Sequence, residues 1–280
     1  MDEKKINYTL GAWLAIIGAV LGIALNYAFF MALYQPLMAA IFDKSGEGSL
    51  MVIKYLLPAF TDVGIIAGIL YVISAIGFFK KAKWAYVLAV TANVLALWTS
   101  FWPMIPVLDV IGVGYTELTP LHIFIFLPNI ILYFLLNGTT GKRNLGRLVV
   151  GLLTGMAFIM AFIDGTASLN IGYMKGLGLV EGDNSLYVMA NRLFWLAAFG
   201  YGIITVGIMC FPKEWIRMLG IGSAIICMLF GFPMGIITTL AKGEISMYLG
   251  APVISVVLIV IFLIPSLWNK LMKLEEVKEE

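Results

Sequence analysis

The chain has 280 residues, of which 61% are hydrophobic and 12% are charged, and its mean hydropathy is +0.99. An ordinary globular domain is about 45–50% apolar and roughly 25% charged, so this composition excludes a soluble enzyme or binding domain. The apolar residues lie in runs of about 20 or more, the length that crosses a hydrocarbon layer about 30 Å thick. We therefore predict an all-α polytopic membrane protein, whose first partner is the lipid bilayer.

Eight apolar segments are long enough to be membrane spans. They are expected at Leu10–Tyr34, Pro58–Phe79, Trp84–Pro106, Thr119–Leu136, Leu148–Asn170, Leu193–Phe211, Trp215–Leu240 and Ile245–Trp268. The first segment is too long for the apolar core of a cleaved signal peptide, so it is expected to be a retained helix. Two outer loops of similar length, Gln35–Leu57 and Ile171–Arg192, follow the first and fifth spans.

The basic residues predict the orientation of these spans. Thirteen of the 18 lysines and arginines fall on one side of the predicted membrane and five on the other. Short cytoplasmic loops carry the excess of basic residues, so both termini are predicted to be cytoplasmic. We expect a multi-pass protein of the plasma membrane. Its basic turns are too small to form a nucleic-acid surface.

Two segments of the chain carry a similar signature. Trp84 and Trp215 each open a span and are 131 residues apart, and the strings Trp102-Pro103-Met104 and Phe232-Pro233-Met234 are 130 residues apart. The predicted fold is therefore two tandem, parallel four-helix repeats, residues 1–140 and 141–280, related by an axis along the membrane normal. A chance likeness between apolar segments of similar composition remains the alternative.

Glycine pairs suggest where helices touch. Gly18 with Gly22 and Gly151 with Gly155 form G-x-x-x-G patterns, which let two helix backbones approach closely within a membrane. Because the two pairs lie at similar depths in spans one and five, we expect these helices to form the contact between the repeats.

Charged residues within the predicted spans are the first candidates for a binding site. A carboxylate near the bilayer centre costs about 2.5–3.5 kcal/mol, so Asp62 and Asp164 need a partner or a water-filled cavity. Both are expected in the outer half, and the 130-residue shift places Arg192 at the position of Asp62. A cluster of the three is possible. In the alternative interpretation Arg192 only neutralises one aspartate, and Asp62 is a hydrated interfacial carboxylate.

Amides form the second group of candidates. Asn93 and Asn129 are both expected near the midplane, and Pro128 beside Asn129 is expected to kink its helix and free a carbonyl. Their counterparts in the second repeat are expected to be apolar, about Ala224 and Val253. Asn26 is expected near the depth of Asp164. The amides either floor a binding site or hydrogen-bond neighbouring helices together.

Three outer residues complete the candidate ligand-binding set. Trp98 and Trp102 share one helix face and are either interfacial anchors or the aromatic wall of a pocket. His122 lies at the outer boundary and could titrate near neutral pH. A single histidine and two cysteines inside apolar segments predict no metal site and no cofactor. No catalytic motif is present, so no catalytic residue is assigned.

Three functions remain open. The first is a small-solute transporter or permease, with its polar site near the repeat interface in the outer half of the membrane and a small-molecule solute as partner. The second is a non-catalytic membrane subunit or scaffold, in which the polar residues serve helix packing alone. The third is a membrane-embedded enzyme acting on a lipid or quinone, with acid–base chemistry from Asp164, Asp62 and His122. The missing catalytic motif ranks the enzyme last.

Overall fold

The computed structural model describes residues 6–111, 118–140, 144–169, 185–243 and 245–272, and within these ranges it is helical without a strand. Contacts divide the chain into two compact units, Met1–Arg143 (unit 1) and Asn144–Glu280 (unit 2). Large apolar side chains cover the outward faces of the helices, as expected where lipid replaces water as the solvent.

Unit 1 is a ring of four helical segments. Its elements are α1 (Tyr8–Val20), the π-helical turn η2 (Leu21–Leu25), α2 (Asn26–Phe79), α3 (Trp84–Phe101), α4 (Met104–Ile111) and α5 (Ile123–Gly138). Helix α2 packs against α1 and α3, and α5 packs against α3 and α1. The ring is also closed through the backbone, because the Asn7 amide donates to the Thr139 carbonyl (2.7 Å).

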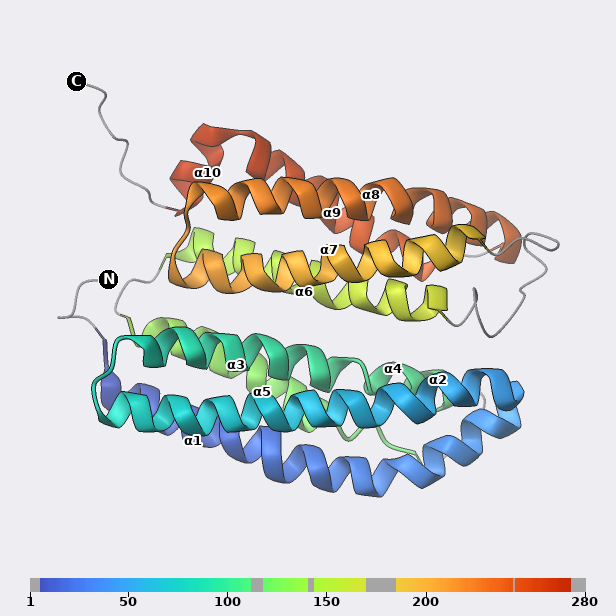
Figure 1. Ribbon diagram of the computed structural model, residues 1–280, viewed down its shortest axis with the longest axis horizontal. Coiled ribbons are helices and arrows are strands. Elements are labelled where there is room, and N and C mark those ends of the chain that lie inside the picture. Colours follow the sequence, from blue (N-terminus) through green and yellow to red (C-terminus); the bar gives the residue numbers. More distant parts are fainter. Residues whose placement is uncertain (1–5, 112–117, 141–143, 170–184, 244, 273–280) are drawn as a thin grey trace. The chain divides into compact units, whose positions relative to one another are not determined.

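Helix α2 folds back on itself. It has 54 residues, and Figure 1 shows it leaving the end of η2, bending, and returning alongside α1. The Asn26 amide donates to the Thr61 carbonyl at 2.8 Å, although both residues belong to α2. In a straight helix 35 residues would span about 52 Å, so the helix must bend between these residues. The bend provides two membrane-spanning segments, Tyr8–Asp43 (with α1) and Ile53–Phe79.

Unit 2 has the same order of neighbours. Its elements are α6 (Leu145–Leu169), α7 (Ser185–Cys210), α8 (Glu214–Lys242), the 3₁₀ turn η4 (Met247–Leu249), α9 (Gly250–Leu263) and α10 (Pro265–Met272). Helix α7 packs against α6 and α8, and α9 packs against α8 and α6.

The last helix of unit 2 turns sharply away from α9. Helices α9 and α10 meet at 94° at Ile264, which is extended (φ −93°, ψ 102°) (Figure 1). Pro265 explains this break, because a proline disfavours the helical conformation of the residue before it. Arg147, at the start of α6, donates from Nε and Nη2 to the Met272 carbonyl (3.0 and 2.8 Å). The start and the end of unit 2 are thereby joined.

In the part of the chain that the structure describes, six helices are long and apolar enough to cross a membrane, or seven if the bent pair α9–α10 counts as one span. These are the helices of a multi-pass membrane protein. The remaining predicted span is α5, which has 16 residues and is shorter than the six. Helix α5 runs through Pro128 without interruption.

Several predicted boundaries are wrong. The expected outer loop Gln35–Leu57 is helical, because α2 continues through Pro36 and Pro58. The predicted spans ended at Tyr34 and began again at Pro58, but a membrane helix can accommodate prolines. Helix α7 begins at Ser185, eight residues before the predicted Leu193. The last predicted span, drawn to Trp268, ends at Leu263.

Glycine brings α1–η2 and the returning part of α2 into close contact. A Cβ on Gly22 would lie 2.8 Å from the Cα and the nitrogen of Gly68, and a Cβ on Gly18 would meet the Tyr71 ring. Real Cβ atoms do not approach a backbone so closely. The Gly18/Gly22 face, which we expected between the repeats, is therefore used inside unit 1.

We expect Gly22→Ala to destabilise the protein. The added methyl meets the Gly68 backbone, which cannot rotate away as a side chain can, and overpacking costs about 1–3 kcal/mol. Gly138→Ala is the matched control in the same unit, because a Cβ there meets nothing within 4 Å. The measurement is the midpoint of thermal unfolding in detergent. Equal midpoints for the two variants would contradict the close approach of α1–η2 and α2.

Candidate functional site

The most unusual polar residue is Asp164 on α6. Its side chain is fully buried (0% exposed). Neither of its carboxyl oxygens has a hydrogen-bond partner among the described residues. Native proteins pair nearly all buried polar atoms, and the need is greatest in the membrane, where water is absent. Asp164 therefore marks the strongest candidate site in the molecule.

Three residues with hydroxyl groups lie in the neighbourhood of Asp164. The Ser168 hydroxyl lies one turn further along α6 and donates to the backbone carbonyl of Asp164 (2.6 Å). The Tyr248 phenol, from η4, lies close to Ser168 and Asp164. The Tyr187 ring, from α7, packs edge-on against Tyr248 with the centroids 6.5 Å apart. We call Asp164, Ser168, Tyr187 and Tyr248 the Asp164 cluster.

The Asp164 cluster is short of hydrogen-bond partners. Within the described residues the hydroxyls of Tyr187 and Tyr248 have none, and neither has that of Thr238, which is buried on α8 one turn beyond Met234. Met234 itself contacts Ser168, with Oγ 3.9 Å from its sulfur. The cluster thus combines one buried carboxyl group with two phenol hydroxyls, and none of these groups has a hydrogen-bond partner among the described residues.

The other two predicted charged residues are not in this cluster. Asp62 on α2 and Arg192 on α7 are exposed on the surfaces of their own units. Arg192 forms no ion pair with Asp164, although its neighbour Asn191 faces α6 and donates to the Gly165 carbonyl (2.6 Å). A grouping of Asp62 with residues of unit 2 stays a prediction.

The two midplane amides of unit 1 lie together. Asn93 donates from Nδ2 to the backbone carbonyl of Asn129 (2.9 Å), and Tyr71 donates to the Asn129 side-chain oxygen (3.3 Å). Asn129 in turn donates to the Ile125 carbonyl (2.9 Å). These bonds join α2, α3 and α5 at one buried point. Such bonds are expected if the amides hydrogen-bond neighbouring helices together rather than bind a ligand.

Asn26 lies directly after the π-helical turn η2. A Cβ on Gly64 would meet its amide and would lie 3.2 Å from the Thr99 hydroxyl, so the three residues are neighbours. The bond from Asn26 to the Thr61 carbonyl fixes the point where the two arms of α2 meet. π-Helical turns occur often at functional sites, but here the turn serves the close packing of η2 on α2.

The outer aromatic residues are buried inside unit 1. Trp98 and Trp102 both pack on Phe60 of α2, Trp98 edge-on at 5.1 Å between ring centroids and Trp102 stacked at 4.5 Å. His122, just before α5, is buried and lies edge-on to Phe29 at 6.0 Å. Neither ring nitrogen of His122 has a hydrogen-bond partner in the described part of the chain.

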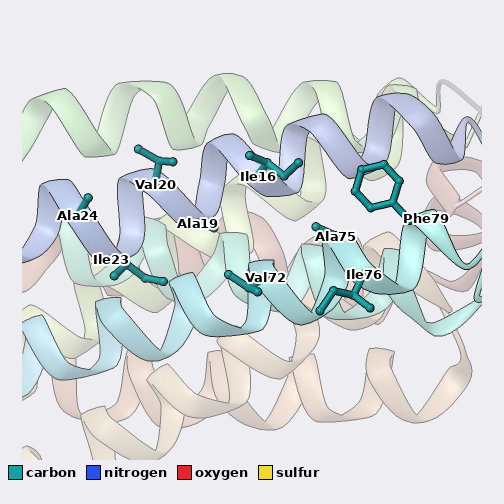
Figure 2. Close-up of a pocket in the computed structure, with 9 residues that line it drawn as sticks. All are labelled: Ile16, Ala19, Val20, Ile23, Ala24, Val72, Ala75, Ile76 and Phe79. Atoms are coloured by element: carbon teal, nitrogen blue, oxygen red, sulfur yellow. The ribbon is translucent and has the colours of Figure 1, made fainter.

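A groove of about 480 Å³ lies on unit 1 between α1–η2 and the returning part of α2 (Figure 2). It is lined by Ile16, Ala19, Val20, Ile23, Ala24, Val72, Ala75, Ile76 and Phe79. This lining exposes no polar surface, so it offers neither a charge nor a hydrogen bond to a polar solute.

Sequence reasoning overlooked the buried tyrosines. Tyr71 donates to Asn129 in unit 1, and Tyr201 hydrogen-bonds Ser255 (2.6 Å) in unit 2. A signal was available, since Tyr71 and Tyr201 are separated by the same 130 residues as the Pro-Met strings. Tyr187 and Tyr248 had no such signal, because the contact between them depends on tertiary structure.

The described residues contain no group of three histidine, cysteine or acidic side chains that could hold a metal ion. Cys210 and Cys227 are free thiols. No family model, curated protein or solved structure matches the chain.

We expect Tyr71→Phe to destabilise the protein slightly, by about 0.6 kcal/mol, the average value of a side-chain hydrogen bond between membrane helices. Asn129→Ala should cost more, because it also leaves the Tyr71 hydroxyl without an acceptor. In the double variant the cost of Tyr71→Phe should vanish. The measurement is thermal unfolding in detergent, with Tyr27→Phe, at an exposed position, as the control. Additive losses in the double variant would show that the two side chains do not interact.

Proposed function

We propose that the protein is a small-solute transporter of the plasma membrane whose polar site is the Asp164 cluster of unit 2. The observation that carries this proposal is the unpaired, fully buried carboxyl on a membrane-spanning helix. Acidic residues in such positions line substrate and ion pathways or proton relays. A carboxyl that served packing alone would be expected to have a partner.

We further propose that the two units are tandem repeats. Residues 61–69 and 191–199 share one pattern of buried and exposed positions at a shift of 130. Gly77 and Gly207 are also 130 residues apart, and they pack on Ala85 and Ile216, which are 131 apart, each time at the turn into the third helix of the unit. Both units also join their start to their end, through Asn7 and Thr139 in one and Arg147 and Met272 in the other.

The tyrosines change one detail of the proposed alignment. Tyr71 and Tyr201 occupy equivalent positions, and each bonds a polar residue of the fourth helix in its unit, Asn129 and Ser255. The counterpart of Asn129 is therefore Ser255 rather than the apolar Val253. The units share this polar contact at mid-helix and differ at Asp164, which lies within the first helix of unit 2.

The second candidate is a non-catalytic subunit or scaffold, and unit 1 favours it. There Asn26 donates to the Thr61 carbonyl and Asn93 donates to the Asn129 carbonyl, while the Asn129 side chain accepts from Tyr71. The three amides thus have the helix-packing role that a scaffold needs. We rank the transporter first because packing does not account for Asp164. The enzyme remains third, since Asp62 is exposed and the Asp164 cluster contains no histidine.

We propose eight spans with both termini in the cytoplasm, in which α5 and α9 cross the membrane despite their lengths. On this topology the Asp164 cluster lies in the outer half. Reporter domains that are active only inside or only outside the cell, fused at either terminus, should both report a cytoplasmic location. One terminus outside would imply an odd number of spans and remove the parallel repeat, and both termini outside would reverse the proposed orientation.

The transporter proposal predicts ligand-dependent stability. Purified protein screened against a panel of small solutes should show at least one that raises the unfolding midpoint, because a ligand that binds only the folded state stabilises it. The Asp164→Asn variant should lose this shift. Its unfolding midpoint without solute should equal that of the wild type. Asp62→Asn, on an exposed site, should retain it. If the shift persists in Asp164→Asn, the solute binds at another site. If no solute shifts the midpoint, the result favours the scaffold.

A further inference from the structure

Among the described residues of unit 2, none of the three arginines is paired with Asp164. Among the described residues, Arg147 is bound to the Met272 carbonyl at the opposite end of α6, about 25 Å away at 1.5 Å per residue. Arg217 pairs with Glu214 at the start of α8 (2.6 Å). Arg192 is exposed. An ionised carboxylate sealed from both water and a cation is strongly disfavoured, so the group must bind a positively charged species.

The surroundings of Asp164 are poorly suited to a metal cation. Helix α6 is unbroken from Leu145 to Leu169, so its carbonyls are used within the helix. Sodium sites in transporters recruit carbonyls from unwound helices. The Ser168 hydroxyl already donates to the Asp164 carbonyl. One carboxyl group with phenols nearby is a small ligand set for an ion that prefers several oxygens.

A proton needs no such ligand set. Among the described residues, the titratable groups near Asp164 on the elements packed around it are Cys227 of α8 and Tyr248 of η4, and Tyr187 of α7 packs on Tyr248. None of them is a cation. The acid form of Asp164 is neutral and needs no counter-cation. A carboxyl that is fully buried and has no hydrogen-bond partner among the described residues is therefore compatible with the protonated form and not with the ionised one.

We infer that Asp164 is a proton-binding site, whose carboxyl carries one proton in the closed structure and releases it to water when the outer end of unit 2 opens. One O–H bond of the carboxylic acid is broken on release and re-formed on uptake, and no bond of the solute changes. The role of this proton in a transport cycle rests on the proposed function. The presence of the proton on Asp164 does not.

Infrared spectroscopy of the purified protein tests this inference directly. At neutral pH the wild type should show the C=O stretching band of a protonated carboxylic acid, and Asp164→Asn should lack it. Asp164→Glu should keep the band at a shifted position, which guards against a variant that fails to fold. Asp62→Asn, the matched exposed control, should leave the band unchanged. A wild-type spectrum without this band, or a band that survives Asp164→Asn, overturns the inference.

Stability distinguishes a proton from a metal cation. Asn has the shape of a neutral carboxylic acid, so Asp164→Asn should leave the unfolding midpoint unchanged. Replacing choline chloride by sodium chloride should also leave the wild-type midpoint unchanged. A sodium-dependent rise that is lost in Asp164→Asn would overturn the proton site in favour of a metal cation. A protonated Asp164 in a protein that no solute stabilises would retain the proton site and remove the transporter.

Discussion

In the hydrocarbon layer every polar group must find its partner inside the protein, and this constraint governs the whole structure. Helices satisfy it for the backbone, so the described residues form helices and turns alone. The side chains satisfy it through a few bonds between helices, such as those from Asn26 to Thr61 and from Asn93 to Asn129. Against this background the buried carboxyl of Asp164 is conspicuous, because it has no hydrogen-bond partner among the described residues and water cannot substitute for the missing bond.

The membrane class could be predicted from composition, because apolar runs of about 20 residues match the thickness of the hydrocarbon layer. The ends of the helices could not. Prolines usually end helices in water, where a freed carbonyl bonds to solvent. In α2 the helix passes through Pro36 and Pro58, and the expected loop became part of a bent helix. Pro265, by contrast, does break the last span, because residues 265–272 turn to pack on the start of α6.

The candidate site was predicted in part. Asp164 could be selected because a charge within an apolar run costs free energy wherever its helix packs. Its neighbours could not be selected, since Tyr187 and Tyr248 approach it only after three helices have packed together. The depth of a residue along a helix also does not indicate which face of the helix it occupies. Asp62 and Arg192 were chosen for their depth, and both lie on exposed faces of their units.

The joining of start and end within each unit has a consequence for how such a chain can grow. In unit 1 the backbone before α1 bonds the backbone after α5, and in unit 2 the first turn of α6 holds the last residue of α10. A unit with this property brings the two ends of its own chain together. A further unit can then follow after a linker of a few residues, with no change to the helices of the first.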